Sequence, residues 1–293
     1  MAKLRWGILG TASIARTVVP AIARSRDNEV TAVASRTLAR AEDWALEMGI
    51  PRAYGSYQEL LDAGGIDAVY VPLPNALHAP WTIRALEAGY PVLCEKPFAL
   101  SAMEANKVQA VSRRTGRPVA EAFMYRFHPL FDKVREILDA GTIGALVSIS
   151  SCFSFCNDDH GSIVASAELG GGALMDVGCY CVNFSRLLAG AEPMRAAALQ
   201  VGDRVDETLM GLLEFPGGIL AQFETSIASA ERHQATICGT EGTIELPSPW
   251  VPGVAETQIL VRRWGEPDVV LPVPGADTYR LEIEDFALAV VTG

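Results

Sequence analysis

Short apolar runs alternate with helix-forming stretches over the first 120 residues, and this alternation constrains the fold more than any other feature of the chain. The expected buried strands are Leu4–Leu9, Val30–Ser35, Ala68–Val71, Val92–Cys94 and Val119–Ala120. The expected helices are Ile14–Arg24, Thr37–Met48, Ser56–Ala63, Ala79–Ala88 and Ser101–Thr115. Strands and helices in alternation build a parallel, doubly wound sheet, so we expect an α/β Rossmann domain over residues 1–122.

The pattern changes after Tyr125, where a single expected helix, Leu130–Ala140, precedes longer strands with little helix between them. The expected strands are Val147–Phe155, Arg195–Val201, Thr208–Phe215, Ile219–Ile227, Gln234–Cys238 and Thr243–Leu246. Pro216-Gly-Gly and Gly239-Thr-Glu-Gly242 are hairpin turns by composition. Residues 123–278 are therefore expected to form an α+β domain with a large, mostly antiparallel open sheet. One layer of helices cannot cover both of its faces, so we expect a homodimer or homotetramer through the open sheet.

Composition excludes several classes of partner. The formal net charge of -11 repels nucleic acid, and no stripe of Lys and Arg tracks a phosphate backbone. No apolar run is long enough to span a membrane, and no secretory leader precedes the first strand, so no membrane partner is expected. The six cysteines lie scattered without zinc spacing, which favours reduced thiols, a cytoplasmic location and no metal.

The end of the first strand carries a dinucleotide-binding pattern. Gly10-Thr11-Ala12-Ser13-Ile14-Ala15 lies between a strand and a helix, although alanine replaces the second and third glycines of the usual fingerprint. The positive end of the following helix can hold a pyrophosphate. A tight turn packed with small residues is the structural alternative.

The end of the second strand indicates which dinucleotide binds there. An NAD enzyme places an acidic residue here for the ribose hydroxyls, but this chain has Ser35 and Arg36 instead. Serine can hydrogen-bond a 2′-phosphate, and arginine can pair with it while stacking on the adenine. We therefore expect NADP rather than NAD, with a solvated Arg36 at a helix start as the alternative.

Four further stretches resemble one family. They are Val69-Tyr-Val-Pro-Leu-Pro-Asn75-Ala-Leu-His78, Val92-Leu-Cys-Glu95-Lys96-Pro97, Glu121-Ala-Phe-Met-Tyr125-Arg126-Phe-His128-Pro and Gly170-Gly-Gly-Ala-Leu-Met-Asp176-Val-Gly-Cys-Tyr180. In order and spacing the chain resembles the Gfo/Idh/MocA oxidoreductases, nearest the branch of D-xylose 1-dehydrogenases and dimeric dihydrodiol dehydrogenases. The resemblance implies a final helix that packs on the Rossmann domain. Residues 279–293 are amphipathic and are expected to begin that helix, which the given chain would cut short.

Lys96 has a physical argument of its own. It ends a parallel strand and precedes Pro97, which directs it to the crevice where Rossmann ligands bind. Asp176 and Tyr180 are four residues apart and share one face if Asp176–Leu188 is a helix. The resemblance implies that Tyr180 is the acid/base residue and that Asp176 binds a substrate hydroxyl. The positive charge of Lys96 would favour the phenolate of Tyr180.

The expected catalytic residues are therefore Lys96, Tyr180 and Asp176. The residues expected at the cofactor are Gly10, Thr11, Ala12, Ser13, Ile14, Ser35, Arg36, Pro72, Leu73, Asn75, His78, Glu95 and Lys96. Expected substrate contacts are Tyr125, Arg126, Asp176 and Phe155, and Phe153, Asn157, Asp158, Trp250 and His128 are further candidates.

The expected reaction moves a hydride between NADP and a carbinol or carbonyl carbon of a sugar or polyol. An aldose 1-dehydrogenase that forms a lactone is the preferred hypothesis. A dihydrodiol, inositol, anhydrosugar or nucleotide-keto-sugar oxidoreductase is the first alternative. A non-catalytic dinucleotide sensor is the second, and the presence of Lys96, Asp176 and Tyr180 together argues against it.

Overall fold

A computed structural model describes residues 3–159 and 161–292. The chain divides into two compact units. The first contains the residues up to Met124 together with those from Thr278 onward, and the second contains Tyr125–Asp277. Each unit is described by itself.

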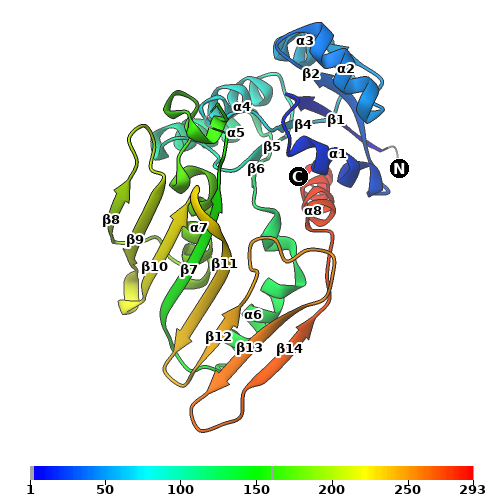
Figure 1. The fold of residues 1–293 in the computed structure, drawn as a ribbon. Helices are drawn as coiled ribbons and strands as arrows, with labels where there is room; N and C mark the ends of the chain where they lie inside the picture. The colour runs from blue at the N-terminus through cyan, green and yellow to red at the C-terminus, as the bar shows by residue number, and fades with distance from the viewer. Residues whose placement is uncertain (1–2, 160, 293) are drawn as a thin grey trace. The chain divides into compact units, whose positions relative to one another are not determined.

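The first unit is built on a six-stranded parallel sheet with the order β3-β2-β1-β4-β5-β6 (Figure 1). Its strands are β1 (Leu4–Leu9), β2 (Asn28–Ala34), β3 (Ala53–Tyr54), β4 (Ala68–Val71), β5 (Val92–Glu95) and β6 (Val119–Ala122). The strand order reverses beside β1, between β1 and β4. This point is the topological switch at which ligands of doubly wound sheets bind.

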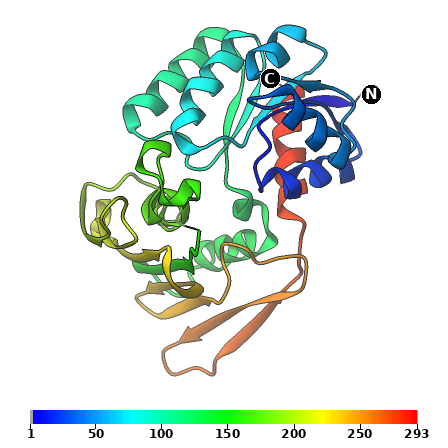
Figure 2. The same cartoon turned by 45° about the horizontal axis from the view of Figure 1, so that its top comes forward.

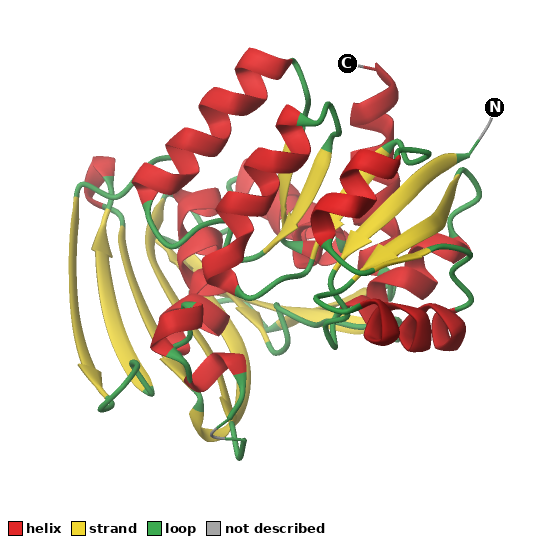
Figure 3. Ribbon diagram, turned by 90° about the horizontal axis from the view of Figure 1, so that it is seen from above, coloured by secondary structure: helices red, strands yellow, loops and turns green. Residues whose placement is uncertain are grey.

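Helices cover both faces of this sheet (Figure 3). They are α1 (Ala15–Arg24), α2 (Leu38–Met48), α3 (Tyr57–Ala63), α4 (His78–Glu87), α5 (Ala102–Thr115) and α8 (Thr278–Thr292). Residues of α1, α2 and α8 share one buried core, and residues of α3, α4 and α5 share the other. The last helix packs on α1 (Figure 2). Its Phe286 ring lies 5.5 Å from the ring of Trp6 on β1.

The predicted alternation is confirmed element by element in this unit, with ends that differ by one or two residues. The short strand β3 was not expected, because two residues carry no readable period. The α/β class is also confirmed: short apolar runs are buried on both sides, as in a parallel sheet covered by helices.

The second unit is built on an eight-stranded sheet with the order β14-β13-β12-β11-β7-β10-β9-β8. Its strands are β7 (Leu146–Cys156), β8 (Arg195–Val201), β9 (Thr208–Glu214), β10 (Leu220–Ser226), β11 (Ala228–Gly239), β12 (Gly242–Leu246), β13 (Thr257–Arg263) and β14 (Val269–Val273). All neighbours are antiparallel except β7 and β10, which are parallel. Both predicted hairpins are confirmed, because β9 pairs with β10 and β11 pairs with β12.

Three strand assignments of the second unit were wrong or missing. β11 runs over 12 residues, whereas only Gln234–Cys238 was expected, because its first half is polar and exposed and carries Glu231 and Arg232. β13 and β14 were not expected at all. Both lie at the edge of the sheet beyond β12, where neighbouring strands rather than sequence periodicity specify the extended backbone.

Two helices cover one face of this sheet: α6 (Pro129–Asp139) contacts β13 and β14, and α7 (Cys179–Ala189) contacts β7 and β10. Apolar side chains on the β8–β10 strands remain exposed. Leu199 is 83% exposed, and Met210, Leu212 and Leu220 are each more than half exposed. The predicted open sheet is therefore present.

In the part of the chain that the structure describes, no helix has both the length and the apolar character needed to cross a bilayer. Over the same residues, no group of three or more His, Cys, Asp or Glu side chains is arranged to hold a metal ion.

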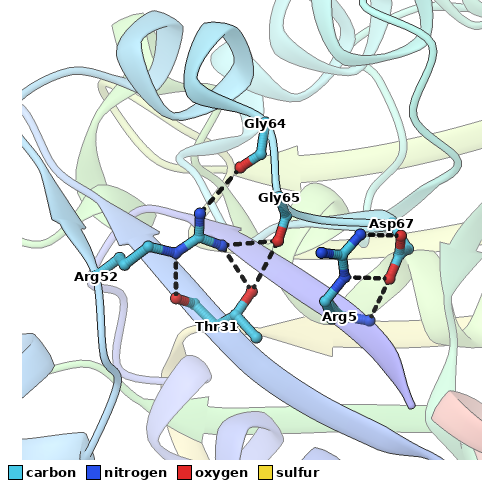
Figure 4. A network of polar contacts seen from close by, with 6 residues as sticks. All are labelled: Arg5, Thr31, Arg52, Gly64, Gly65 and Asp67. Atoms are coloured by element: carbon cyan, nitrogen blue, oxygen red, sulfur yellow. Dashed lines mark hydrogen bonds and ion pairs between the residues drawn. The ribbon is translucent and has the colours of Figure 1, made fainter. Parts of the chain in front are cut away.

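Two arginines tie the loops at the amino-terminal edge of the parallel sheet (Figure 4). Arg5 on β1 donates from Nε and Nη2 to the carboxylate of Asp67, which precedes β4, at 2.8 and 2.7 Å. Arg52 donates to the carbonyl oxygens of Thr31, Gly64 and Gly65. Arg5 lowers the pKa of Asp67 because it donates hydrogen bonds to the charged form.

We expect Asp67→Asn to lower the free energy of unfolding by about 0.5 to 1 kcal/mol at neutral pH, since the ion pair is partly exposed. The lowered pKa of Asp67 means that its contribution is present above pH about 4 and is lost as the pH falls through the folded-state pKa. Urea denaturation at several pH values measures this. Asp43→Asn on the exposed side of α2 is the control, and a difference from wild type that persisted at pH 2 would contradict the prediction.

Candidate active site

The turn between β1 and α1 is shaped to accept a phosphate group. Gly10 has φ +116°, and a Cβ there would lie 3.0 Å from Leu73 Cδ2. Its N–H donates to the carbonyl of Ala34, which ties the turn to β2. α1 begins without a side-chain cap, and the N–H groups of its first residues, Ala15, Arg16 and Thr17, donate to the carbonyls of Ala12, Ser13 and Ile14. A dinucleotide pyrophosphate fits this arrangement because the positive end of the helix favours an anion.

The end of β2 lies beside this turn. Ser35 is buried at the end of the strand, and Arg36 after it is exposed. Arg40, in the first turn of α2, donates from Nε to Thr11 Oγ1 at 2.8 Å. The positive charges of Arg36 and Arg40 both lower the pKa of Tyr57, although burial of the phenol raises it overall. Two guanidinium groups therefore lie near the same corner of the turn.

Arg40 was missed by sequence reasoning. The available signal was its spacing, since it follows Arg36 by four residues with no acidic residue between them. Residues four apart at the start of a helix can face the same ligand.

The loops after β4 and β5 hold the remaining expected cofactor residues. Pro72 and Leu73 follow β4, and a 3-10 turn, Asn75–Leu77, leads into α4. His78, the first residue of α4, is buried with Nδ1 2.7 Å from the Pro97 carbonyl and Nε2 2.6 Å from the Leu73 carbonyl. Burial lowers the pKa of His78, and the two carbonyl contacts oppose that effect.

Lys96 lies between two anchored neighbours. The Tyr70 hydroxyl on β4 donates to Glu95 Oε1 at 2.6 Å, inside the sheet core. The next peptide bond, Lys96–Pro97, is cis, and the Phe98 N–H donates to Glu121 Oε1 at 2.7 Å. Burial and the adjacent charge of Glu95 raise the pKa of Tyr70 well above its ordinary value. The backbone around Lys96 is therefore held by side chains of β4 and β6.

A residue of the C-terminal helix α8 lies near Glu95 and Lys96. Burial, followed by the charges of Glu95 and Glu282, raises the pKa of Tyr279 to about 12, while the charge of Lys96 lowers it. Tyr279 is thus near both Glu95 and Lys96 within the first unit. Sequence reasoning did not single it out, because nothing in the helical pattern of residues 278–292 indicates which strand end it meets.

Asp176 and Tyr180 lie on one continuous helical run in the second unit. Leu174–Gly178 forms a π-helical turn and α7 continues it, rather than the uniform helix Asp176–Leu188 that the sequence predicts. Four residues in such a run span about one turn, so the two side chains project from the same side. Single π turns inside helices occur frequently at functional sites.

The start of this helical run is fixed by two side chains, one from the connection between β8 and β9 and one from β10. Asp206 Oδ2 accepts a 2.6 Å hydrogen bond from the Leu174 N–H, and Thr225 Oγ1 donates to the Ala173 carbonyl at 3.0 Å. Burial raises the pKa of Asp206. A Cβ at Gly172, where φ is +107°, would lie 2.1 Å from Asp206 Oδ1, so this position requires glycine.

Tyr180 is buried in an aromatic cluster. Its ring centroid lies 5.3 Å from Phe153, 5.7 Å from Tyr125 and 6.2 Å from Trp250. The Tyr125 hydroxyl donates to Asn183 Oδ1 at 2.6 Å, one turn along α7 from Tyr180. The cluster holds the phenol of Tyr180 at a defined place on α7.

The other candidates from the second unit lie around this cluster or away from it. Phe155 follows Phe153 by two residues on β7 and so shares its face. His128 caps α6, accepting from the Leu130 N–H. Arg126 lines a hollow with Asn183 and Arg186. Asn157 and Asp158 lie in the loop after β7, where Asp158 accepts from the Cys156 thiol.

Comparison with known proteins assigns the chain to a family. Residues 4–123 match the model of the oxidoreductase family with an NAD-binding Rossmann fold, GFO_IDH_MocA, and residues 131–245 match the GFO/IDH/MocA C-terminal domain. The chain belongs to the Gfo/Idh/MocA family of oxidoreductases, and the resemblance stated from its motifs is confirmed. It is an NAD(P)-dependent enzyme of that family.

Two curated relatives and one solved structure illustrate the match. The chain is 42% identical over 296 residues to D-xylose 1-dehydrogenase (NADP(+)) 2 of Haloferax volcanii, covering 99% of this chain and 90% of the relative. It is 37% identical over 256 residues to the trans-1,2-dihydrobenzene-1,2-diol dehydrogenase of Mus musculus, and the match covers 85% of this chain and 76% of the relative. The crystal structure of KijD10, a 3-ketoreductase from Actinomadura kijaniata, in complex with NADP and TDP-benzene matches with a TM-score of 0.92 and 33% sequence identity. The match covers 99% of this chain and 90% of KijD10.

Proposed function

We propose that the protein is an NADP-dependent aldose 1-dehydrogenase that oxidises a D-xylose-like sugar to its lactone. The observation that carries this proposal is the placement of Asp176 and Tyr180 four residues apart on one helical run, with Tyr180 set among Phe153, Tyr125 and Trp250. A carboxylate and a phenol on one side of a helix can bind one sugar hydroxyl and take the proton of another. The D-xylose 1-dehydrogenase relative, at 42% identity, supports the choice of substrate.

The enzyme acts on sugars or related compounds and uses NADP. Relatives of this chain include D-xylose, dihydrodiol and nucleotide-sugar enzymes, and two of the matched proteins carry NADP in their name or their crystals. The structure offers a reason for the preference: Arg36 and Arg40 flank the turn at Thr11, and Ser35 occupies the place of an acidic residue. Two guanidinium groups suit a 2′-phosphate through charge-assisted hydrogen bonds.

In the proposed mechanism, the nicotinamide of a bound NADP would supply the acceptor for the hydride of the anomeric carbon. Tyr180 removes the proton of the anomeric hydroxyl, so that the carbon–oxygen bond becomes the carbonyl of the lactone. Lys96 would lower the cost of the negative charge on the substrate oxygen. Asp176 binds a second hydroxyl and orients the ring. The residues that would hold the pyrophosphate are Gly10, Thr11, Ala12, Ser13 and Ile14, and those that would surround the nicotinamide are Pro72, Leu73, Asn75, His78 and Glu95.

The reaction is tested by absorbance at 340 nm with NADP and a panel of aldoses, inositols, anhydrosugars, cyclic diols and, in the reductive direction, nucleotide-linked keto sugars. We expect oxidation of xylose or a close aldose. Lys96→Ala and Tyr180→Phe should each lower kcat by about 100-fold or more, because general acid–base catalysis contributes factors of that size. Lys107→Ala on α5 and Tyr90→Phe in the connection between α4 and β5 are matched controls. If only a diol or a keto sugar is turned over, the proposed aldose substrate is wrong. If Lys96→Ala leaves kcat undiminished, the proposed mechanism is wrong.

Selection of NADP is tested at Arg40. We expect Arg40→Ala to weaken NADPH binding about tenfold and to leave NADH binding nearly unchanged, since only the former has a 2′-phosphate for the guanidinium to pair with. Titration of protein fluorescence measures both affinities. Arg113→Ala on α5 is the control. Equal weakening of both cofactors would show that Arg40 acts only by holding Thr11.

We also propose that two copies associate through the open sheet, as a homodimer or as one interface of a homotetramer. The supporting observation is the apolar surface of β8–β10, where a hollow of about 510 Å³ lies between exposed Leu199, Met210 and Leu212. The same apolar surface on a second copy can pack against it, so that both surfaces are removed from water. A cytoplasmic location stays a prediction, supported by six free cysteines.

We expect light scattering to give a dimer or tetramer for the wild type, and Leu212→Glu to shift it toward monomer because a carboxylate would be buried in the interface. Leu46→Glu on α2, which is also strongly exposed, is the control. A monomeric wild type at micromolar concentration would overturn the proposal.

A further inference from the structure

The imidazole of His78 is in an unusual hydrogen-bonding position. It is 1% exposed, and each of its two nitrogens faces a backbone carbonyl oxygen: Nδ1 faces Pro97 at 2.7 Å, and Nε2 faces Leu73 at 2.6 Å. These carbonyls belong to the loops after β5 and β4, which are neighbouring strands of the parallel sheet. One ring therefore joins two loops at the edge of the sheet where Rossmann ligands bind.

A neutral imidazole cannot satisfy both contacts. It carries one N–H donor and one acceptor nitrogen, whereas a carbonyl oxygen only accepts. In the neutral form one nitrogen lone pair would face an oxygen lone pair at hydrogen-bond distance. With both nitrogens protonated, the ring donates two charge-assisted hydrogen bonds, and such bonds are short.

Lys96 lies between the groups that these contacts hold. On one side Glu95 is fixed by the Tyr70 hydroxyl, and on the other the Pro97 carbonyl meets His78. The Leu73 side chain, whose carbonyl meets the other nitrogen, packs over Gly10 in the phosphate-binding turn. The imidazole thus links the backbone at Lys96 to the loop that borders the cofactor turn.

We propose that His78 is a positioning residue that donates from both ring nitrogens, and that this double contact fixes the backbone on which Lys96 stands relative to the cofactor loop. The protonation part of the proposal stands on geometry alone. The kinetic part rests on the proposed role of Lys96.

The charged groups around the ring act in opposite directions. Burial lowers the pKa of His78 and so does the positive charge of Lys96, while the two carbonyl acceptors raise it. On β5, Cys94 and Glu95 lie next to the same loop, and on β6 Glu121 holds Phe98 directly after Pro97. Arg84, on the same helix as His78, packs over Trp81. Burial is the largest of these effects and lowers the pKa of His78 overall, so the proposal rests on the two contacts of 2.6 and 2.7 Å, which a neutral ring cannot both satisfy.

His128 supplies an internal comparison. Its Nδ1 accepts from the Leu130 N–H at 3.0 Å, and its Nε2 faces the Gly253 carbonyl at 3.3 Å. One donor and one acceptor face this ring, so a neutral tautomer with a single N–H satisfies it. The same protein therefore contains one histidine whose surroundings call for two N–H groups and one whose surroundings call for one.

The protonation state is tested by nitrogen-detected NMR of the full protein with ¹⁵N-labelled histidine. At pH 7 we expect two protonated ring nitrogens for His78 and one for His128. The second proton of His78 is expected at pH 7 because both carbonyl contacts require a donor, in opposition to the lowering of its pKa by burial. A single N–H at His78, with an unprotonated nitrogen at pH 7, would overturn the proposal. Assignment by replacing each of the other three histidines in turn keeps the test available even if His78 variants do not fold.

The positioning role is tested with His78→Gln, whose single amide nitrogen cannot reach two carbonyls on opposite sides of the ring position. With the substrate found in the panel, we expect kcat to fall about tenfold, because the reacting groups are misplaced rather than removed, with KM for NADP changed by less than about twofold. Arg84→Gln on the same helix is the control. Unchanged kcat in His78→Gln would refute the positioning role. If the wild type turns over no compound of the panel, the proposed function is wrong. The NMR experiment decides the protonation of His78 in either case.

Discussion

The hydrogen bonds that join neighbouring parallel strands are the constraint on which the first unit depends. Since β1, β2, β4 and β5 all point the same way, their carboxyl ends meet at one edge of the sheet, and the residues that follow them come together from positions as far apart in sequence as Gly10 and Lys96. Gly10, Ser35, Leu73 and Lys96 each follow a different strand of this group. The chemistry of this edge therefore follows from the register of the sheet.

Side-chain contacts to the backbone refine that edge. Tyr70, Glu121 and His78 hold Glu95, Phe98 and Pro97, the residues on either side of Lys96. A lysine on a four-carbon stem is flexible, so the position of its amine depends on how firmly its own backbone is held. The network is buried, where each hydrogen bond is stronger than in water and each missing one costs more.

In the second unit, different contacts fix the positions of the expected catalytic residues Asp176 and Tyr180. Helix α7 follows a π turn whose start is held by Asp206, before β9, and by Thr225 on β10. Tyr180, at the beginning of α7, is enclosed by aromatic rings. Gly172 is required because Asp206 occupies the space of its missing Cβ. Gly172 and the residues Asp176 and Tyr180 are thus parts of one arrangement, in which Gly172 allows Asp206 to approach the start of the helical run.

The sequence by itself determined the α/β alternation, the open sheet, both hairpins, the family and the cofactor turn, because periodicity, turn residues and local motifs are all short-range properties. The sequence pattern did not predict strands β13 and β14 or the polar half of β11, because pairing with neighbouring strands decides their conformation. Arg40 at Thr11, Tyr279 near Glu95, Asp206 at Leu174 and the two carbonyls around His78 are contacts that no local pattern encodes. Only the tertiary structure decided them, because packing of distant segments selects which side chains meet.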